Sequence, residues 1–171
     1  MKKKPRLIFM ILTSVIWLLS SNCSASESKA VYVHTVDFQT IDSRFQNQAP
    51  WEINNGELYF SGAEKEKLYW NLFEYPTQAN FRCEAKVRWR NGTDNQGFGL
   101  IFNLVDNANF CIFEVSGNGY FQVQQCLAGQ WRSLIPWKRS ILVQRNTPNH
   151  LRIISAGKYI KLMINGVFVA V

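Results

Sequence analysis

Histidine is scarce in this chain, and the residue patterns of common enzymes are missing. His34 and His150 are the only histidines among 171 residues, and neither lies in a zinc-binding or catalytic-triad motif. Glycoside hydrolysis needs two carboxyl groups flanking the scissile bond. No strand carries the closely spaced Glu-x-Asp-x-x-Glu pattern that would supply them. The sequence therefore predicts a non-catalytic protein without a cofactor.

Metal-binding motifs are also missing. Asp94-Asn95 and Asp106-Asn107 offer oxygen ligands on loops. Successive hairpin loops lie at opposite ends of a sheet, so these two pairs should not converge on one ion. We interpret them as turn residues and expect no metal site.

The chain also lacks a long amphipathic helix, an internal repeat and a low-complexity tract. The stretch from Leu7 to Leu19 has thirteen mostly apolar residues, whereas a membrane-spanning helix needs about 20. Basic residues precede this run and small polar residues follow it, which is typical of a secretory signal. The pattern predicts a signal peptide at 1–25, a short tether at 26–30 and one domain at 31–171. Cys23 is an alternative cleavage point, because a cysteine soon after an apolar run is a candidate for lipid attachment.

Removal of the leader lowers the formal charge from +7 to +3, because its four cations have no acidic counterpart. The basic composition therefore reports mainly the targeting segment, and we expect no nucleic-acid partner. Membrane contact is expected only through the leader or a lipid at Cys23. The domain should be exported and be periplasmic, anchored to the cell envelope or extracellular.

Alternating apolar and polar residues dominate the rest of the chain. From Phe81 to Arg90 apolar side chains occupy every second position, which is typical of a half-buried antiparallel strand. Asn-Gly pairs separate several such runs, as they do where a turn needs positive φ. The pattern predicts an all-β antiparallel sandwich with strands at 31–38, 57–61, 68–73, 81–90, 97–103, 109–116, 120–126, 131–134, 141–144, 151–154 and 159–164.

One hairpin can be registered from its residues. A three-residue loop, Gly117–Gly119, would pair Val115 with Phe121 and Phe113 with Val123, so that apolar residues face each other. Extended to its neighbours, the register places the 81–90 strand beside the 97–103 strand.

The same register decides the positions of the cysteines. It puts Cys111 inside the sandwich and Cys126 outside, which argues against a disulfide between them. Cys83 shares the inner face with Cys111, and the pair could form a disulfide, but buried free thiols are the favoured reading.

The run Phe110-Cys-Ile-Phe-Glu-Val-Ser-Gly-Asn-Gly-Tyr120 resembles a hairpin of bacterial laminin-G-like, concanavalin A-like jelly-roll domains. Gly97-Phe-Gly-Leu-Ile-Phe102 and the Trp51–Tyr59 segment are similar to further landmarks of that family. The resemblance implies a jelly-roll fold and leaves several functions open, from lectins to glycanases and adhesion domains. Domains of that family usually have two more strands after the Asn-Gly that corresponds to Asn165-Gly166, whereas this chain stops at Val171. The resemblance therefore implies a C-terminally incomplete domain whose sheet edge is open to a protein partner.

The register also gives a candidate binding face. Gly97 and Gly99 leave a shallow trough between neighbouring strands, and planar polar groups beside an aromatic ring suit a sugar. We expect a recognition module that binds carbohydrate or the cell-envelope surface. The alternatives are a protein-interaction or envelope-structural domain and, third, a carbohydrate hydrolase. The candidate ligand-binding residues are Lys86, Arg88, Glu114, Tyr120, Gln122 and Gln124.

Overall fold

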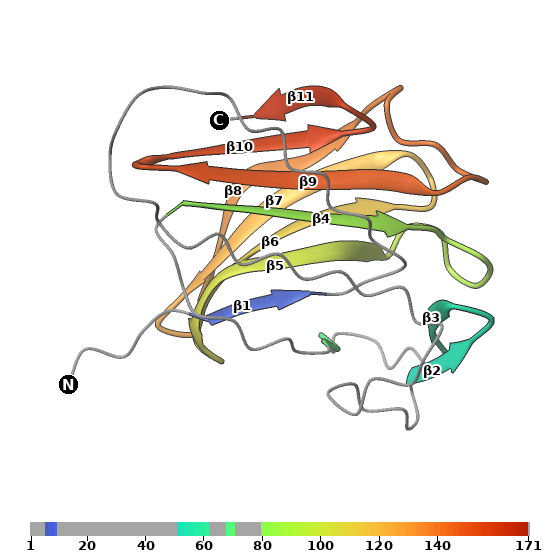
Figure 1. Cartoon of the computed structure of the whole chain (residues 1–171), viewed down its shortest axis with the longest axis horizontal. Coiled ribbons are helices and arrows are strands. Elements are labelled where there is room, and N and C mark those ends of the chain that lie inside the picture. Colours follow the sequence, from blue (N-terminus) through green and yellow to red (C-terminus); the bar gives the residue numbers. More distant parts are fainter. Residues whose placement is uncertain (1–5, 10–50, 62–67, 71–79, 171) are drawn as a thin grey trace, which may run out of the picture.

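The computed structural model describes residues 6–9, 51–61, 68–70 and 80–170 (Figure 1). In these residues the chain is all-β, without a helix, and all strand pairs are antiparallel. The strands are β1 (Arg6–Phe9), β2 (Trp51–Asn54), β3 (Glu57–Phe60), β4 (Phe81–Val87), β5 (Gly97–Asp106), β6 (Asn109–Ser116), β7 (Tyr120–Leu127), β8 (Gln130–Arg139), β9 (Asn149–Ala156), β10 (Tyr159–Ile164) and β11 (Val167–Ala170).

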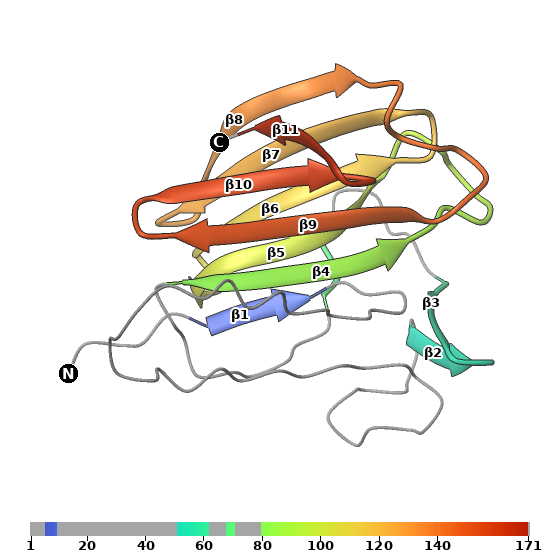
Figure 2. The ribbon, with the colours of Figure 1, turned by 45° about the horizontal axis from the view of Figure 1, so that its top comes forward.

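Two larger sheets lie over one another in an arrangement consistent with a β-sandwich (Figures 1 and 2). One has the strand order β1-β5-β6-β7-β8, the other β11-β10-β9-β4, and β2 and β3 form a separate hairpin. Alternate residues of both sheets fill the space between them, because one face of each strand is apolar. The fully buried side chains of this core include Phe113, Leu100, Leu151, Ile153 and Ile164.

The predicted hairpin register is confirmed. Val115 pairs with Phe121 and Phe113 with Val123. Gly119 has a φ of 94° and its N–H donates to the Ser116 carbonyl, as the three-residue loop requires. The predicted pairing of the next strand is also confirmed, with Leu100 opposite Phe113.

The predicted neighbour of the 81–90 strand is wrong. β4 pairs with β9, where Cys83 is opposite Ile153 and Ala85 opposite Leu151, and not with β5. The nine residues between β4 and β5 carry the chain from one sheet to the other. An apolar strand face packs equally well beside any apolar neighbour, so the alternation in β4 could not reveal this crossover.

Other strand predictions need smaller corrections. Residues 141–144 are not in a strand, while β8 is longer than the predicted strand and reaches Arg139. After the Asn165-Gly166 turn, β11 forms an unpredicted strand beside β10. β1 lies within the predicted signal peptide and pairs with β5. Several predictions fall outside the described residues: the strand at 31–38, Cys23 and the boundaries at 25 and 30. Of the predicted 68–73 strand, residues 68–70 are described and are not in a strand, and residues 71–73 are not described.

Cys83 lies on the four-stranded sheet, and Cys111 and Cys126 lie on the five-stranded sheet. Cys83, Cys111 and Cys126 are buried free thiols. Cys83 and Cys111 belong to the core between the sheets, whereas Cys126 lies on the outer face, as the register predicts. Burial raises the pKa of Cys83 and of Cys111, which keeps both thiols protonated.

A second apolar cluster covers part of the outer face of the five-stranded sheet. Phe110 and Ile112 pack there with Cys126, and Trp70 lies against them. Trp131 of β8 meets Phe110 edge-on, with ring centroids 5.4 Å apart. None of the described residues forms a helix that could span a bilayer.

Candidate functional site

The crossover of β4 divides the predicted binding residues between two sheets. Lys86 belongs to β4 and Arg88 follows it, so both adjoin the four-stranded sheet. Glu114 lies on β6, and Tyr120, Gln122 and Gln124 lie on β7, in the five-stranded sheet. The core separates the outer faces of these sheets. Lys86 and Arg88 therefore cannot share one ligand surface with the other four residues.

Glu114 and Gln122 are opposite each other on the outer face of the five-stranded sheet, and both are buried. The Gln122 amide donates a hydrogen bond to Glu114 Oε1. A Cβ atom on Gly97 would overlap the Glu114 carboxyl group. The space expected as a trough above Gly97 is thus filled by Glu114, because glycine leaves room for this side chain on the neighbouring strand.

Burial raises the pKa of Glu114, and the hydrogen bond from Gln122 offsets part of this rise. A carboxyl group whose pKa is higher in the folded state stabilises the fold below its unfolded pKa. That contribution is lost as the pH rises through the folded pKa. Above its raised pKa, Glu114 is a desolvated charge whose hydrogen-bond partner is Gln122.

We expect Glu114→Gln to raise the melting temperature by a few degrees at pH 7, since glutamine keeps the acceptor for Gln122 and removes the buried charge. The gain should shrink toward pH 4, where Glu114 itself becomes neutral. Thermal melts of both proteins between pH 4 and pH 8 test this, and Glu52→Gln on β2, where Glu52 is exposed, is the control. A stabilisation that does not change with pH would contradict the prediction.

Beside Glu114 and Gln122, polar and aromatic side chains remain accessible along β7 and β8. The register of these strands places five residues on one face, and we call them the β7–β8 strip. Trp131 is 52% exposed, and the others are half-buried or exposed. The strip consists of Tyr120, Gln124, Trp131, Ser133 and Arg139.

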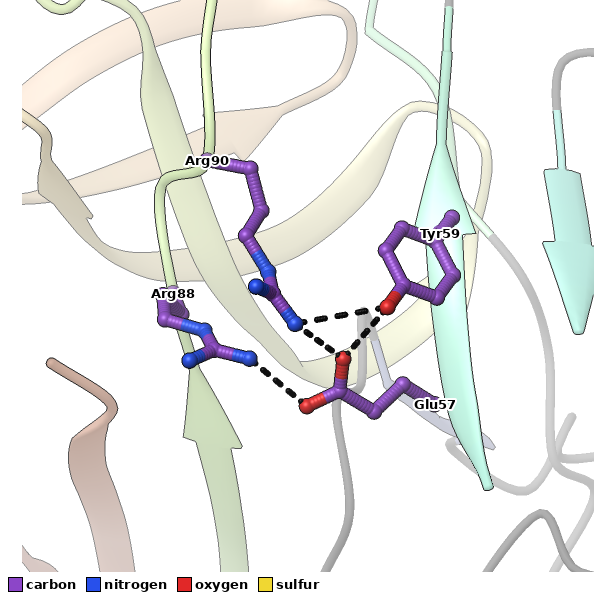
Figure 3. Close-up of polar contacts among 4 residues, drawn as sticks. All are labelled: Glu57, Tyr59, Arg88 and Arg90. Carbon is purple, nitrogen blue, oxygen red and sulfur yellow. Dashed lines mark hydrogen bonds and ion pairs between the residues drawn. The ribbon is translucent and has the colours of Figure 1, made fainter. Parts of the chain in front are cut away.

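Arg88 takes part in a different cluster, which joins the β2–β3 hairpin to the segment after β4 (Figure 3). Its Nη2 lies 2.8 Å from Glu57 Oε1, and Arg90 Nη2 lies 2.5 Å from Glu57 Oε2. The Tyr59 hydroxyl donates to Glu57 Oε2 at 2.7 Å. Two guanidinium groups and a phenol thus converge on one carboxylate from β3.

The electrostatics of this cluster favour an ionised Glu57. The hydrogen bond from Tyr59 and the charges of Arg90 and Arg88 lower the pKa of Glu57 despite some burial. The same hydrogen bond raises the pKa of Tyr59. The Arg90 guanidinium also lies 5.7 Å from the Tyr59 ring centroid. Arg88 and Arg90 therefore form ion pairs within the chain, and the cluster links the β2–β3 hairpin to the segment after β4.

Sequence reasoning missed Glu57, Tyr59 and Arg90. Glu57 and Tyr59 fall in a predicted strand, and the Asn55-Gly56 turn before them signals a hairpin. Their partners lie 31 or more residues later. No local spacing indicates such a contact.

A second charged cluster lies on the outer face of the four-stranded sheet. Glu84 is only 1% exposed and contacts His150 Nε2 at 2.5 Å and Arg152 Nη2 at 3.0 Å, as well as Arg82. Neither carboxylate oxygen of Glu84 accepts a hydrogen bond from the described residues, so its contacts with Arg82 and Arg152 are ionic. Burial lowers the pKa of His150, while Glu84 opposes this shift. The sequence places Glu84 among Arg82, Lys86 and Arg88, but of these only Arg82 contacts it, and its other partners, His150 and Arg152, come from β9.

The described residues hold no cluster of three or more histidine, cysteine or acidic side chains that could bind a metal ion. Models of known protein families, curated proteins and solved structures were each compared with the chain, and none matches it.

Proposed function

We propose that the protein is an exported, non-catalytic recognition module that binds carbohydrate of the cell envelope through the β7–β8 strip. The proposal includes a jelly-roll, laminin-G-like topology for the two sheets. The observation that carries it is the row of accessible polar and aromatic side chains on one face of β7 and β8. Of the six residues expected from the sequence, the strip keeps Tyr120 and Gln124. It omits Lys86, Arg88, Glu114 and Gln122, and it adds Trp131, Ser133 and Arg139.

The chemistry of the strip suits a sugar. An exposed indole offers a flat apolar surface to the C–H face of a pyranose ring, and Trp131 is held in place by its edge contact with Phe110. The Gln124 amide and the Ser133 hydroxyl lie opposite each other and both donate and accept hydrogen bonds. The planar guanidinium group of Arg139, which lies opposite Tyr120, adds several N–H donors.

A binding role agrees with these groups better than a hydrolytic one does. Glu114 has the raised pKa that an acid catalyst needs. However, no second carboxylate faces it from the neighbouring positions of β5 and β7, which are Gly99 and Gln122. Glycoside hydrolysis by the usual routes requires such a pair.

We expect Trp131→Ala to weaken binding to a retained glycan about tenfold or more, because it removes the stacking surface. Gln124→Ala should also weaken binding. A glycan array followed by calorimetric titration of the strongest ligand measures both effects. The matched control is Tyr159→Ala, which removes a similarly exposed aromatic ring from the four-stranded sheet.

The outcomes separate the proposal from its main alternative. Equal losses in Trp131→Ala and Tyr159→Ala would show that the strip is not the site. Failure of the wild-type chain to retain any glycan would favour the protein-interaction role. The exposed apolar residues Leu134 and Trp137 on β8, an edge strand among the described residues, would then be the first surface to test.

A further inference from the structure

Acidic residues are distributed very unevenly along the chain. Glu114 is the last of them, and residues 115–171 contain none. Seven lysine and arginine residues occur in the same 57 residues. Strands β9, β10 and β11, which make up most of the four-stranded sheet, all come from this segment. The sheet should therefore carry a strong excess of positive charge.

The strand register shows where these cations lie. On the outer face of the four-stranded sheet, Lys86 is opposite His150, and Glu84 is opposite Arg152. Arg82 is opposite Ile154, which is in turn opposite Lys161 on β10. We call this surface the basic face. Its cations are Arg82, Lys86, Arg152 and Lys161, with Lys158 at the turn between β9 and β10.

Among the residues that the structure describes, Glu84 is the only acidic one on the basic face, and it is not available to a ligand. It is buried beneath Arg82, His150 and Arg152, which it contacts. Lys86 and Lys161 are exposed, and no carboxylate of the described residues forms an ion pair with either. In the described part of the chain, the surface thus presents positive charge without an accessible negative group.

Aromatic side chains accompany these cations. Tyr159 on β10 is 54% exposed and Phe168 on β11 is 51% exposed. Phe168 is opposite Met163, and Met163 is opposite Arg152. Phe168 therefore lies on the same face of the sheet as the cations. Figure 2 shows the four strands as one continuous layer over the other sheet. With strands about 4.8 Å apart, this layer is about 15 Å wide.

We propose that the basic face docks on an anionic lipid bilayer. A broad layer with five cations matches a surface that carries many separate negative charges, and clusters of four to eight lysine or arginine residues are typical of anionic-lipid binding. Aromatic rings beside the cations favour the bilayer over a soluble polyanion, since such rings partition into the headgroup region. A second copy of the chain is a poor partner, because the two basic faces would repel each other.

This inference does not depend on carbohydrate binding, because the β7–β8 strip lies on the opposite sheet. It also goes beyond contact through the leader or a lipid at Cys23. A domain held to the bilayer by its basic face would turn the strip away from the membrane, toward the envelope.

The test is co-sedimentation of the full chain with vesicles of phosphatidylcholine containing 30% phosphatidylglycerol, compared with pure phosphatidylcholine. We expect binding to the anionic vesicles that weakens with added salt. Lys86→Gln with Lys161→Gln should reduce the partition coefficient about tenfold to thirtyfold, since each cation contributes separately to attraction by the surface.

The matched control is Arg132→Gln with Lys138→Gln, which removes two exposed charges from β8, away from the basic face. This control variant should retain most of the binding to the anionic vesicles. Both double variants carry residues 1–25 unchanged, so those residues cannot account for a difference between them. Equal losses in the two double variants would overturn the proposal, because only net charge would then matter. Absence of binding to anionic vesicles would overturn it too. So would tighter binding to soluble polyglutamate than to the vesicles, which would identify the partner as an acidic polypeptide.

Discussion

Glu84→Gln should lower the free energy of unfolding by about 2–3 kcal/mol, although the substitution conserves the size of the side chain. Glu84 is the only negative charge within reach of Arg82, Arg152 and His150 among the described residues. Glutamine would remove the charge that offsets the repulsion between the partly buried Arg82 and Arg152 guanidinium groups. The full cost of an unpaired buried charge is about 3–5 kcal/mol, and we reduce it because the arginine side chains are about one quarter exposed.

Urea denaturation of wild type and Glu84→Gln measures this cost, and Glu52→Gln is a control with the same chemical change on exposed β2. The double variant Glu84→Gln with Arg152→Gln should recover part of the loss, because it removes one of the two repelling cations. A Glu84→Gln protein as stable as the Glu52→Gln protein would contradict the interpretation.

The local part of the fold could be predicted from the sequence. The β6–β7 register followed from a glycine that accepts positive φ and from apolar residues opposite each other. The β5–β6 pairing followed from the same alternation. In both cases the partners are neighbours along the chain, and a short loop leaves few alternative registers.

The non-local part could not be predicted in this way. The alternation in β4 indicated which side chains are buried, and Cys83, Ala85 and Val87 are indeed in the core. It could not indicate the neighbouring strand, because Leu151 and Ile153 of β9 offer the same apolar surface as β5. The chain carries no local signal for the crossover between the sheets.

The residues of the candidate site also had some features that could be predicted from the sequence and others that could not. The sequence placed Glu114 and Gln122 on the outer face of their strands, and the structure confirms this placement. The burial of these two side chains and the ion pair between Arg88 and Glu57 depend on contacts between distant segments. Local reasoning therefore predicted which way these side chains point, but not which groups they meet.

Gly99 illustrates a position where the backbone itself excludes a side chain. A Cβ atom there would overlap the Phe113 carbonyl oxygen and would lie 2.7 Å from Glu114 Cα. Both atoms belong to the backbone of β6, which cannot move without breaking its pairing with β5 and β7. We expect Gly99→Ala to lower the free energy of unfolding by about 3 kcal/mol. Chemical denaturation measures the loss, and hydrogen exchange of the β5 and β6 amides should show where the opening occurs.

Gly97→Ala is the informative comparison, since it makes the same change two residues earlier on the same strand. Its Cβ atom would meet the Glu114 carboxyl group, not backbone. A side chain can turn away, so the cost should be about 1 kcal/mol and should nearly vanish when Glu114→Ala is added. Glu114→Ala should give no such relief to Gly99→Ala. If it rescued both variants equally, the close approach of the β5 and β6 backbones at Gly99 could not be the cause of the strain.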